Sequence, residues 1–448
     1  MMASEDNRMS GRIRRYTRVG ASVGGLAARM AGQRYLGMKS DPARNAADLS
    51  RALGGLKGPL MKVAQLLATI PDGLPDEYIE ELRALQAHAP AMGWAFVKRR
   101  MAAELGADWR GRFAEFEQQA AAAASLGQVH RARGLDGRKL ACKLQYPDMA
   151  STVEADLRQL KLIFALYKRY DPAIDTREIL HEITARLREE LDYRREAGHL
   201  ALYGAMLEGE GGVHVPIALP DLSTGRLLTM TWLDGAPLLD AVSRPQEARN
   251  RIAGNMFTAW YRPFYRYGVL HGDPHLGNYT IRGDGAVNLL DYGCVRIFPA
   301  GFIQGVIDLY HGVQQGDRAL MVHAFESWGF SGLSSEMVDA LALWANYIYG
   351  PLTEDRVRLI DESGSGKFGG AVAAKVHREV RRLGGVTPPG EFVLLDRSAI
   401  GLGSVFIHLG AKLNWHRAFE ELIAGFDSGA LAARQQKILQ FAGVPEAV

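Results

Sequence analysis

Three polar residues between positions 271 and 293 have a spacing that strongly limits what this chain can fold into. Asp273 stands five residues before Asn278, and Asp291 follows thirteen residues after that asparagine. The intervening segment alternates apolar and polar residues around Gly283-Asp284-Gly285, which predicts a tight hairpin. Such a hairpin folds Asp291 back beside Asn278. We therefore expect two oxygen ligands to converge where a Mg²⁺ ion would bridge nucleotide phosphates, with Asp273 facing the nucleophile.

The same segment matches the order of two motifs in protein kinases. Their catalytic loop reads H-R-D-x-x-x-x-N, and a D-F-G motif follows it. Here His271-Gly272-Asp273 and Asn278 correspond to the first motif, and Asp291-Tyr292-Gly293 corresponds to the second. The pattern predicts phosphoryl-transfer chemistry.

Two other interpretations of the loop remain open from the residues alone. His271, Asp273 and His275 could be the metal ligands of a hydrolase, because two histidines four apart on a helix form a zinc pattern. Pro274 and Gly277 argue against a helix at this position. The second alternative is a histidine-rich turn without chemical function. We favour phosphotransfer because the downstream Asp-Tyr-Gly fits only that chemistry.

A nucleotide-binding lysine is expected upstream of this loop. Residues 138–146 alternate as a strand that follows a turn at Leu135-Asp136-Gly137. Ala141-Cys142-Lys143 resembles the V-A-I-K strand whose lysine holds the α- and β-phosphates. A lone strand lysine is usually a solvated surface residue, but Lys143 precedes Asp273 in a kinase-like order.

The lysine should pair with a glutamate on a following helix, and the spacing of apolar residues predicts one helix through residues 179–197. We favour Glu196 as the partner of Lys143, with Glu190 and Asp192 near the phosphates. A charged helix face with i,i+4 pairs is the alternative interpretation of these acids.

An alanine-rich segment occupies the place of a glycine-rich phosphate loop. Residues 119–124 read Gln-Ala-Ala-Ala-Ala-Ala and continue through Ser125 into Gly127. Alanine restricts the backbone freedom with which glycine approaches phosphates, and an alanine run by itself favours a helix. The continuation into a strand instead predicts a modified phosphate loop that includes Ala124 and Ser125.

A further helix is predicted around Pro59 in the N-terminal part of the chain. Lys62 and Gln65 are three residues apart and share one face of that helix. By spacing alone, such a pair is an ordinary solvated face.

Together these residues resemble the UbiB/AarF family of atypical kinases, also called the ADCK family. The resemblance rests on Lys62-x-Ala-Gln65, the Ala122–Ser125 loop, Lys143, Glu190-x-Asp192 and the loop from His271 to Asn278. It implies an α+β, two-lobed protein-kinase-like fold with an N-terminal helical extension packed over the active site. It also implies an ATPase that binds ATP or ADP with Mg²⁺ and supports ubiquinone biosynthesis, with Lys62 and Gln65 acting at the covered site.

The composition is consistent with this fold and limits the kinds of partner that we expect the protein to bind. The chain has 448 residues, a net charge of +3 and two cysteines, Cys142 and Cys294. This balance gives no reason to expect a nucleic-acid partner, and the cysteines are expected to be small buried residues rather than a disulfide or metal site. No stretch reaches the roughly 18 apolar residues of a membrane span, and no secretory signal is evident.

We expect a cytoplasmic protein that associates peripherally with membrane. The basic segment Gly11–Arg18 could contact an anionic membrane surface, and a solvated terminus is the alternative. Ubiquinone-precursor lipids and other ubiquinone-biosynthesis proteins are the partners that the resemblance implies. The expected organisation is a basic lead (1–48), a helical extension (49–106), a kinase-like N-lobe (107–235) and a helical C-lobe (236–448).

Two other functions remain open. The His271-Gly272-Asp273 sequence also fits small-molecule phosphotransferases of the aminoglycoside/choline-kinase type, although these lack the alanine loop and the Lys62/Gln65 helix. A nucleotide-bound pseudokinase scaffold is the other, and the intact Lys143, Asp273, Asn278 and Asp291 count against it.

Overall fold

The computed structural model describes residues 92–123, 126–147, 149–155, 157–158, 161, 184–185, 187–330, 332–362, 370–383 and 390–446. Lys62, Gln65, Ala124, Ser125 and the basic segment 11–18 lie outside these residues, as does most of the expected N-terminal extension. The chain divides into two compact units. The first contains the chain up to Arg194 together with Leu219–Met230, and the second contains Arg195–Ala218 and Thr231–Val448.

The first unit is built on a four-stranded sheet with the order β1-β2-β3-β5. Its strands are β1 (Phe113–Ala123), β2 (Gly127–Gly134), β3 (Lys139–Gln145) and β5 (Leu227–Thr231). The turn predicted between β2 and β3 is confirmed: the Gly134 nitrogen donates to the Arg138 carbonyl at 2.9 Å, and Gly137 has a φ of +81°. That left-handed conformation favours glycine.

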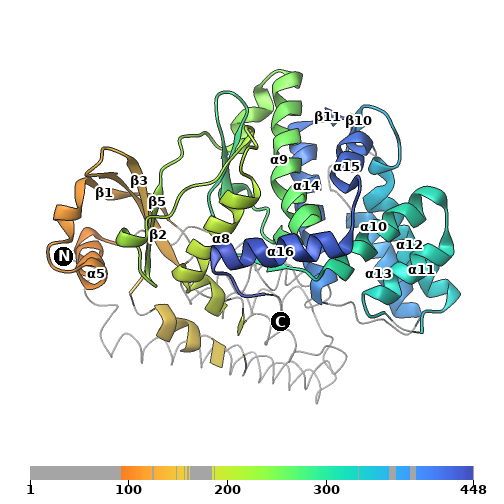
Figure 1. The fold of residues 1–448 in the computed structure, drawn as a ribbon, viewed down its shortest axis with the longest axis horizontal. Coiled ribbons are helices and arrows are strands. Elements are labelled where there is room, and N and C mark those ends of the chain that lie inside the picture. The colour runs from red at the N-terminus through yellow and green to blue at the C-terminus, as the bar shows by residue number, and fades with distance from the viewer. Residues whose placement is uncertain are drawn as a thin grey trace, which may run out of the picture. The chain divides into compact units, whose positions relative to one another are not determined.

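Helix α5 (Trp94–Leu105) packs on this sheet and forms the core of the first unit (Figure 1). Val97, Met101 and Leu105 recur every four residues, so they share one face of the helix. They lie against Leu140 and other buried strand residues, with Trp109 of the short helix η1 (Trp109–Arg112) beside them.

Neither Cys142 nor Cys294 forms a disulfide within the described residues. Cys142 on β3 belongs to the same core, and burial raises the pKa of its thiol to about 12.

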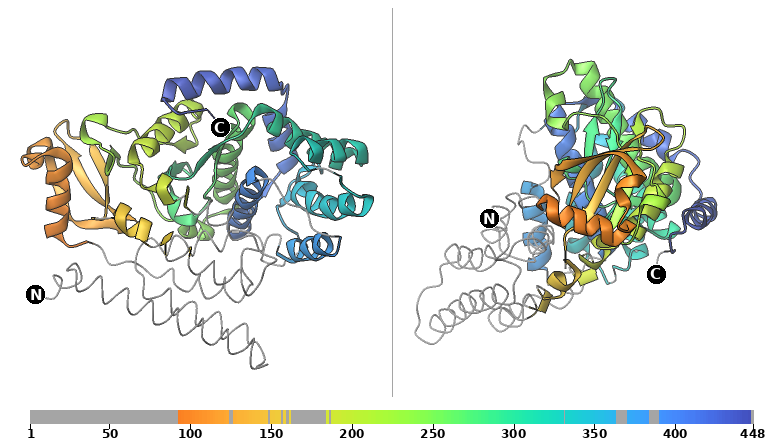
Figure 2. Two further views of the ribbon diagram at one scale, coloured as in Figure 1. Left: turned by 90° about the horizontal axis from the view of Figure 1, so that it is seen from below. Right: turned by 90° about the vertical axis from the view of Figure 1, so that its left-hand side faces the viewer.

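The second unit is mainly helical, and helices α10 to α13 gather at one end of it (Figures 1 and 2). Its longer helices are α8 (Tyr193–Met206, which begins in the first unit), α9 (Gln246–Tyr267), α10 (Ala300–Gln315), α11 (Arg318–Ser327), α12 (Ser335–Tyr349), α13 (Gly370–Arg382), α14 (Gly390–Leu409), α15 (Trp415–Ile423) and α16 (Ser428–Ala442). This unit also contains short strands. They form a three-stranded sheet of β4 (Val213–His214), β8 (Val287–Leu289) and β7 (Tyr279–Ile281), a pair of β6 (Val269–His271) and β9 (Val295–Ile297), and a pair of β10 (Arg358–Leu359) and β11 (Lys412–Leu413).

Helix α9 leads directly into the loop that carries the candidate site. It ends at Gly268, whose φ of +65° turns the chain into β6. Gln435 of α16 fastens this turn, because its side-chain amide donates to the carbonyl of Tyr267 at 2.7 Å and to that of Phe298 at 2.9 Å. One side chain of α16 therefore holds the end of α9 beside the segment that leads into α10. Among the described residues, no helix combines the length and apolar character that crossing a membrane requires.

Candidate nucleotide and metal site

Two strand pairs of the second unit bring the 271–293 segment together. Antiparallel β6 and β9 pair His271 with Val295, and the Gly272 nitrogen donates to the Cys294 carbonyl at 2.7 Å. The chain entering the loop thus runs beside the chain that leaves Asp291-Tyr292-Gly293. The space at Gly272 is filled, because a Cβ there would lie 2.9 Å from the Cys294 sulfur.

The hairpin predicted between Asn278 and Asp291 is confirmed. Strands β7 and β8 are antiparallel, with Tyr279 opposite Leu289. The Leu290 nitrogen donates to the Asn278 carbonyl at 2.8 Å, so Asp291 follows the residue bonded to Asn278. At the turn, Gly285 has a φ of +89°, as the Gly283-Asp284-Gly285 pattern requires.

Asp273 and Asn278 are joined directly. The Asn278 amide nitrogen donates to the Asp273 carbonyl oxygen and to its carboxylate Oδ2, each at 3.0 Å. These two bonds use the nitrogen of the amide, which leaves its oxygen as the atom that could bind a cation. The loop between the two residues contains the one-turn helix η4 (Leu276–Asn278), and its segment 272–275 is not helical.

His271 holds the two aspartate-bearing segments against each other. The Asp273 nitrogen donates to His271 Nδ1 at 3.2 Å. Because Nδ1 of the His271 ring accepts this hydrogen bond, Nε2 of the same ring carries the proton. Nε2 donates to the Asp291 carbonyl oxygen, 2.7 Å away. The residue is only 1% exposed. Its carbonyl accepts hydrogen bonds from Trp260 Nε1 at 3.0 Å and from Ser398 Oγ at 3.2 Å.

These contacts argue against the hydrolase interpretation. Both ring nitrogens of His271 have backbone partners, and Nδ1 of His275 accepts a hydrogen bond from the Gly277 nitrogen at 3.1 Å. The described residues contain no group of three or more His, Cys, Asp or Glu side chains placed to hold a metal ion. His271 is a positioning residue whose role the sequence motif did not reveal.

The Asp291-Tyr292-Gly293 segment is anchored by its aromatic residue. Tyr292 is fully buried, its hydroxyl donates to the Leu289 carbonyl at 3.3 Å, and its ring lies 5.2 Å from that of Tyr203. Its carbonyl is 3.0 Å from Nδ1 of His199, a buried residue of α8. Carboxylate Oδ1 of Asp291 accepts from the Gly293 nitrogen at 3.0 Å. The backbone around Asp291 is thus fixed, and the donor set fits magnesium: a carboxylate and an amide oxygen are ligands that this hard cation prefers.

Lys143 lies on β3 of the first unit, as predicted. It is opposite Val129 of β2, and its Nζ is 5.4 Å from the ring centroid of Tyr193. Gly127, which begins β2, lies beneath the same tyrosine. A Cβ at Gly127 would clash with the Leu144 carbonyl oxygen and would come 2.8 Å from the Tyr193 hydroxyl. This glycine is therefore required by close packing under the Lys143–Tyr193 contact.

The alanine run forms a strand, so the helical alternative is wrong. Ala120 to Ala123 lie in β1, with Ala122 opposite Val129 and Ala123 opposite Gln128. Two antiparallel strands joined by a short connection are the frame that a phosphate loop needs. Ala124 and Ser125, which lie between these strands in the sequence, are outside the described residues.

The single helix predicted through residues 179–197 is wrong in its described part. The helical turns of residues 187–190 end at Leu191, and α8 begins at Tyr193. The carboxylate of Asp192 accepts a hydrogen bond from the Arg194 nitrogen at 3.1 Å, so it caps the new helix. Glu196 lies in the first turn of α8 and is only 3% exposed. Glu190 and Glu196 are thus on different helical segments, which the apolar spacing could not show.

Gln128 and His130 are buried polar residues that the sequence reasoning missed. Gln128 accepts from the Met92 nitrogen at 2.5 Å and donates to the Met92 carbonyl at 3.3 Å. The same amide nitrogen lies 2.7 Å from His130 Nε2, and His130 Nδ1 lies 2.9 Å from the Glu117 carbonyl. The chain preceding α5 is therefore fastened to β2 one residue after Gly127. A signal was present in the alternation of the strand, because Gln128 and His130 share a face with Ala132, opposite the exposed Arg131 and Arg133.

Comparison with known proteins places this arrangement in a family. Residues 84–325 match the ABC1 atypical kinase-like domain. The mitochondrial atypical kinase COQ8 of Saccharomyces cerevisiae is 26% identical over 377 residues, which are 82% of this chain and 74% of that protein. The chloroplastic protein ACTIVITY OF BC1 COMPLEX KINASE 7 of Arabidopsis thaliana is 34% identical over 266 residues, covering 58% of this chain and 38% of the relative. The mitochondrial atypical kinase COQ8B of Danio rerio is 27% identical over 317 residues, covering 68% of this chain and 50% of the relative.

A solved structure agrees with these matches. The structure of Rv3197 from Mycobacterium tuberculosis, determined in complex with erythromycin, has a TM-score of 0.61 and 26% sequence identity. The match covers 86% of this chain and 96% of that one. The expected kinase-like α+β fold is confirmed. The matched region spans half or less of the length of two of the three relatives named above. The chain belongs to the ABC1 atypical kinase-like family, the UbiB group that its motifs resemble.

Proposed function

We propose that this protein is a UbiB-type ATPase that binds Mg-nucleotide and supports ubiquinone biosynthesis. The observation that carries the proposal is the joining of three residues in one fixed loop. Asn278 donates to the Asp273 carboxylate at 3.0 Å, and its carbonyl accepts from the nitrogen of Leu290, next to Asp291. A kinase-like site needs this set: a metal-binding pair and a carboxylate beside it.

Each proposed role follows from the chemistry of the side chain. The amide oxygen of Asn278 and the carboxylate of Asp291 would hold Mg²⁺, which neutralises phosphate charge when bound. Asp273 would orient an attacking water or hydroxyl and accept its proton. The amide of Asn278 supports this role, because its hydrogen bond to Oδ2 holds the Asp273 carboxylate in place.

The first unit would supply the phosphate contacts. Lys143 would bind the α- and β-phosphates and pair with Glu196, as its position on a hairpin strand beside Tyr193 supports. Ala124 and Ser125 would form the phosphate loop at the turn between β1 and β2, with Glu190 and Asp192 near the phosphates. Residues 107–235 and 236–448 remain our proposed kinase-like lobes.

The resemblance supplies the remaining parts of the proposal. Lys62 and Gln65 would cover the site and suppress transfer to protein substrates. Arg12, Arg14, Arg15 and Arg18 would contact an anionic membrane surface, each contributing on the order of 1 kcal/mol at low salt. Ubiquinone-precursor lipids would be the molecules handled there, and other ubiquinone-biosynthesis proteins the partners.

A small-molecule phosphotransferase is the second candidate. His271-Gly272-Asp273 fits that group, and one structural relative was solved with the small molecule erythromycin. Product analysis separates the two functions. With labelled ATP, the proposed ATPase releases inorganic phosphate and labels no generic protein substrate. Stoichiometric appearance of a phosphorylated alcohol would support the second candidate, and strong labelling of a generic protein would contradict the covered site.

A further inference from the structure

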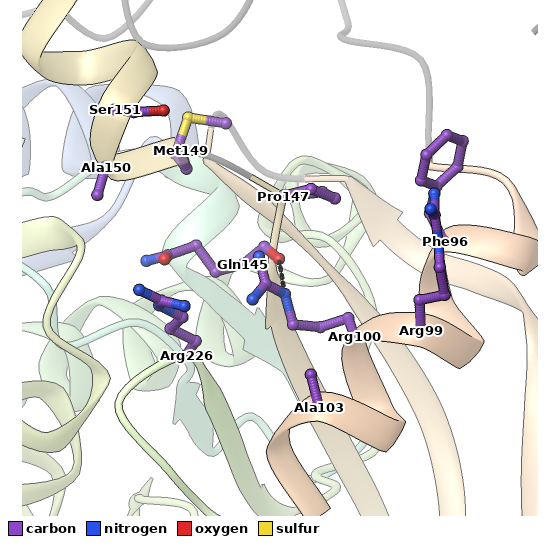
Figure 3. Close-up of a pocket in the computed structure, with 10 residues that line it drawn as sticks. All are labelled: Phe96, Arg99, Arg100, Ala103, Gln145, Pro147, Met149, Ala150, Ser151 and Arg226. Atoms are coloured by element: carbon purple, nitrogen blue, oxygen red, sulfur yellow. Dashed lines mark hydrogen bonds between the residues drawn. The ribbon is translucent and has the colours of Figure 1, made fainter. Parts of the chain in front are cut away.

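The first unit contains a cavity of about 410 Å³ that the proposed nucleotide chemistry does not use (Figure 3). One wall is a stripe of α5, the second is the end of β3 with Pro147, and the third is the helical segment at residues 149–151. Arg226, just before β5, closes it from the side of the sheet. Three of the ten residues lining the cavity are arginines, and none of these described residues is acidic.

The helix periodicity of α5 explains why two of these arginines face the cavity. Phe96, Arg99, Arg100 and Ala103 are spaced three or four residues apart, so they form one stripe. That stripe adjoins the Val97, Met101 and Leu105 face, which packs on the sheet. Packing of the apolar face therefore fixes the direction in which the arginine stripe points.

Arg100 is a structural part of the cavity wall. Its guanidinium donates to the Gln145 carbonyl at 3.1 Å and to the Tyr146 carbonyl at 3.0 Å. It also pairs with Glu104 at 3.2 Å, and its side chain is only 10% exposed. The charge of Arg100 is thus balanced, and the residue fastens α5 to the end of β3.

Arg99 and Arg226 are different, because the described residues give neither of them an acidic partner. The Arg99 guanidinium lies over the Phe96 ring, 4.6 Å from its centroid. The backbone carbonyl of Arg226 accepts from the Gln145 nitrogen at 3.1 Å, which fixes where its side chain starts. Within the described residues, the Arg226 guanidinium makes no hydrogen bond or ion pair. Figure 3 shows Arg226 and Arg100 converging on Gln145.

The lining therefore combines two positive charges with an apolar surface. Guanidinium groups match the paired oxygens of a carboxylate or phosphate. Phe96, Ala103, Pro147 and Met149 supply the apolar part of the lining. The volume lies in the range of ordinary ligand pockets.

We propose that this cavity is a second ligand site, which binds a small organic anion: a carboxylate or phosphate ester joined to an apolar group. Arg226 would contact the anion, and Phe96 and Met149 the apolar group. Arg99, beside Phe96 on the other side of the cavity (Figure 3), would add positive charge without contacting the anion. The proposal goes beyond the ATPase function, since Lys143, Asp273, Asn278 and Asp291 take no part in it.

Calorimetric titration of the full chain with four probes tests this site. Phenyl phosphate and benzoate are expected to bind, inorganic phosphate to bind more weakly, and phenol not to bind. Arg226→Gln should weaken phenyl phosphate binding about tenfold. Arg99→Gln should weaken it less, because the charge of Arg99 acts from the other side of the cavity. The matched control Arg133→Gln, on the exposed side of β2 with Glu115 as its partner, should leave the affinity unchanged. A titration with dihexanoyl phosphatidic acid, a short-chain lipid phosphate, tests whether the anion belongs to a lipid. Tighter binding of this compound than of phenyl phosphate indicates a lipid headgroup, and tighter binding of phenyl phosphate indicates a soluble phosphate ester.

Two results would overturn the proposal. One is that none of the anions binds. The other is that phenyl phosphate binding is lost in Lys143→Ala but kept in Arg226→Gln and Arg99→Gln, because the anion would then occupy the nucleotide site. Arg226→Lys keeps the positive charge but loses the paired N–H donors of the guanidinium group, so it should bind phenyl phosphate with an affinity between those of wild type and Arg226→Gln. Arg226→Lys also serves as the test variant if Arg226→Gln folds poorly. If the protein proved not to hydrolyse ATP, the results expected from these anion titrations would stay the same.

Discussion

The side-chain amide of Asn278 donates two hydrogen bonds to Asp273, one to its backbone carbonyl and one to its carboxylate, both at 3.0 Å. A single residue thereby sets both the path of the loop and the direction of the carboxylate. The same residue offers its amide oxygen on the other side. These two hydrogen bonds therefore position the proposed general base, Asp273, and one proposed magnesium ligand, Asn278, relative to each other.

Asp273→Asn should separate binding from turnover. The variant keeps an oxygen that can accept from Asn278 but loses the carboxylate that would take a proton. We expect unchanged Mg-nucleotide affinity and a loss of ATP hydrolysis of roughly 10²- to 10⁴-fold. Steady-state phosphate release and nucleotide titration measure the two quantities. Asp284→Asn, at the hairpin turn, is the control and should retain activity. Full activity in Asp273→Asn would assign the role to another carboxylate, such as Asp192.

His271→Ala should be far more damaging than His275→Ala. Removing His271 leaves the Asp273 nitrogen and the Asp291 carbonyl without their partner in a buried site. We expect a loss of roughly 2–5 kcal/mol in unfolding free energy and a fall in activity. His275 is exposed and bonds only within its own turn, so its loss should cost less than about 1 kcal/mol. Chemical denaturation measures the unfolding free energy of both variants. Equal losses in His271→Ala and His275→Ala would contradict the role of His271 as the bridge between Asp273 and Asp291.

Gly127→Ala should destabilise the first unit. The added methyl group meets the Leu144 carbonyl and the Tyr193 hydroxyl, and such overpacking typically costs about 1–3 kcal/mol. Gly111→Ala is the matched control, because a Cβ there has no neighbour within 4 Å. We expect that control to be neutral. Thermal unfolding compares them, and a neutral Gly127→Ala would show that β2 can move away from Tyr193 without cost.

The stability of wild-type protein should depend on His130 at mildly acidic pH. Burial lowers the pKa of His130 below its ordinary value of 6.5. The unfolded chain then binds a proton more readily than the folded one, so stability is lost as the pH falls through and below 6.5. Protonation would also place a donor on Nε2 opposite the Gln128 amide nitrogen.

His130→Asn, which cannot titrate, isolates this contribution. The difference in unfolding free energy between wild type and variant should be constant above about pH 7 and should shrink as the pH falls. Denaturation at a series of pH values measures it. A difference independent of pH would show that His130 stays accessible to protons in the folded state.

The local parts of the site were predictable from the sequence. The hairpin between Asn278 and Asp291 follows from turn glycines and strand alternation, and both act over a few residues. The strand carrying Lys143 was found in the same way. The turn at Leu135-Asp136-Gly137 sets the register in which this strand, β3, pairs with β2.

The errors and omissions come from contacts that local patterns do not encode. The helix predicted through 179–197 breaks because Asp192 caps a new helix with its side chain, a choice that apolar periodicity ignores. The alanine run becomes a strand because β2 pairs with it, although alanine by itself favours a helix. The contact between Gln128 and Met92 joins residues 36 positions apart, so no local window contains it.

Thermal-shift titration with Mg-ADP tests the central claim most directly. Wild-type protein should be stabilised by Mg-ADP, and both Asp291→Asn and Lys143→Ala should lose most of that stabilisation. A tenfold loss of affinity lowers the stabilisation by about 1.4 kcal/mol at saturating ligand. The stabilisation of wild type should also disappear when magnesium is chelated. Equal Mg-ADP stabilisation in wild type, Asp291→Asn and Lys143→Ala would contradict the assignment of this loop and this strand to a nucleotide site.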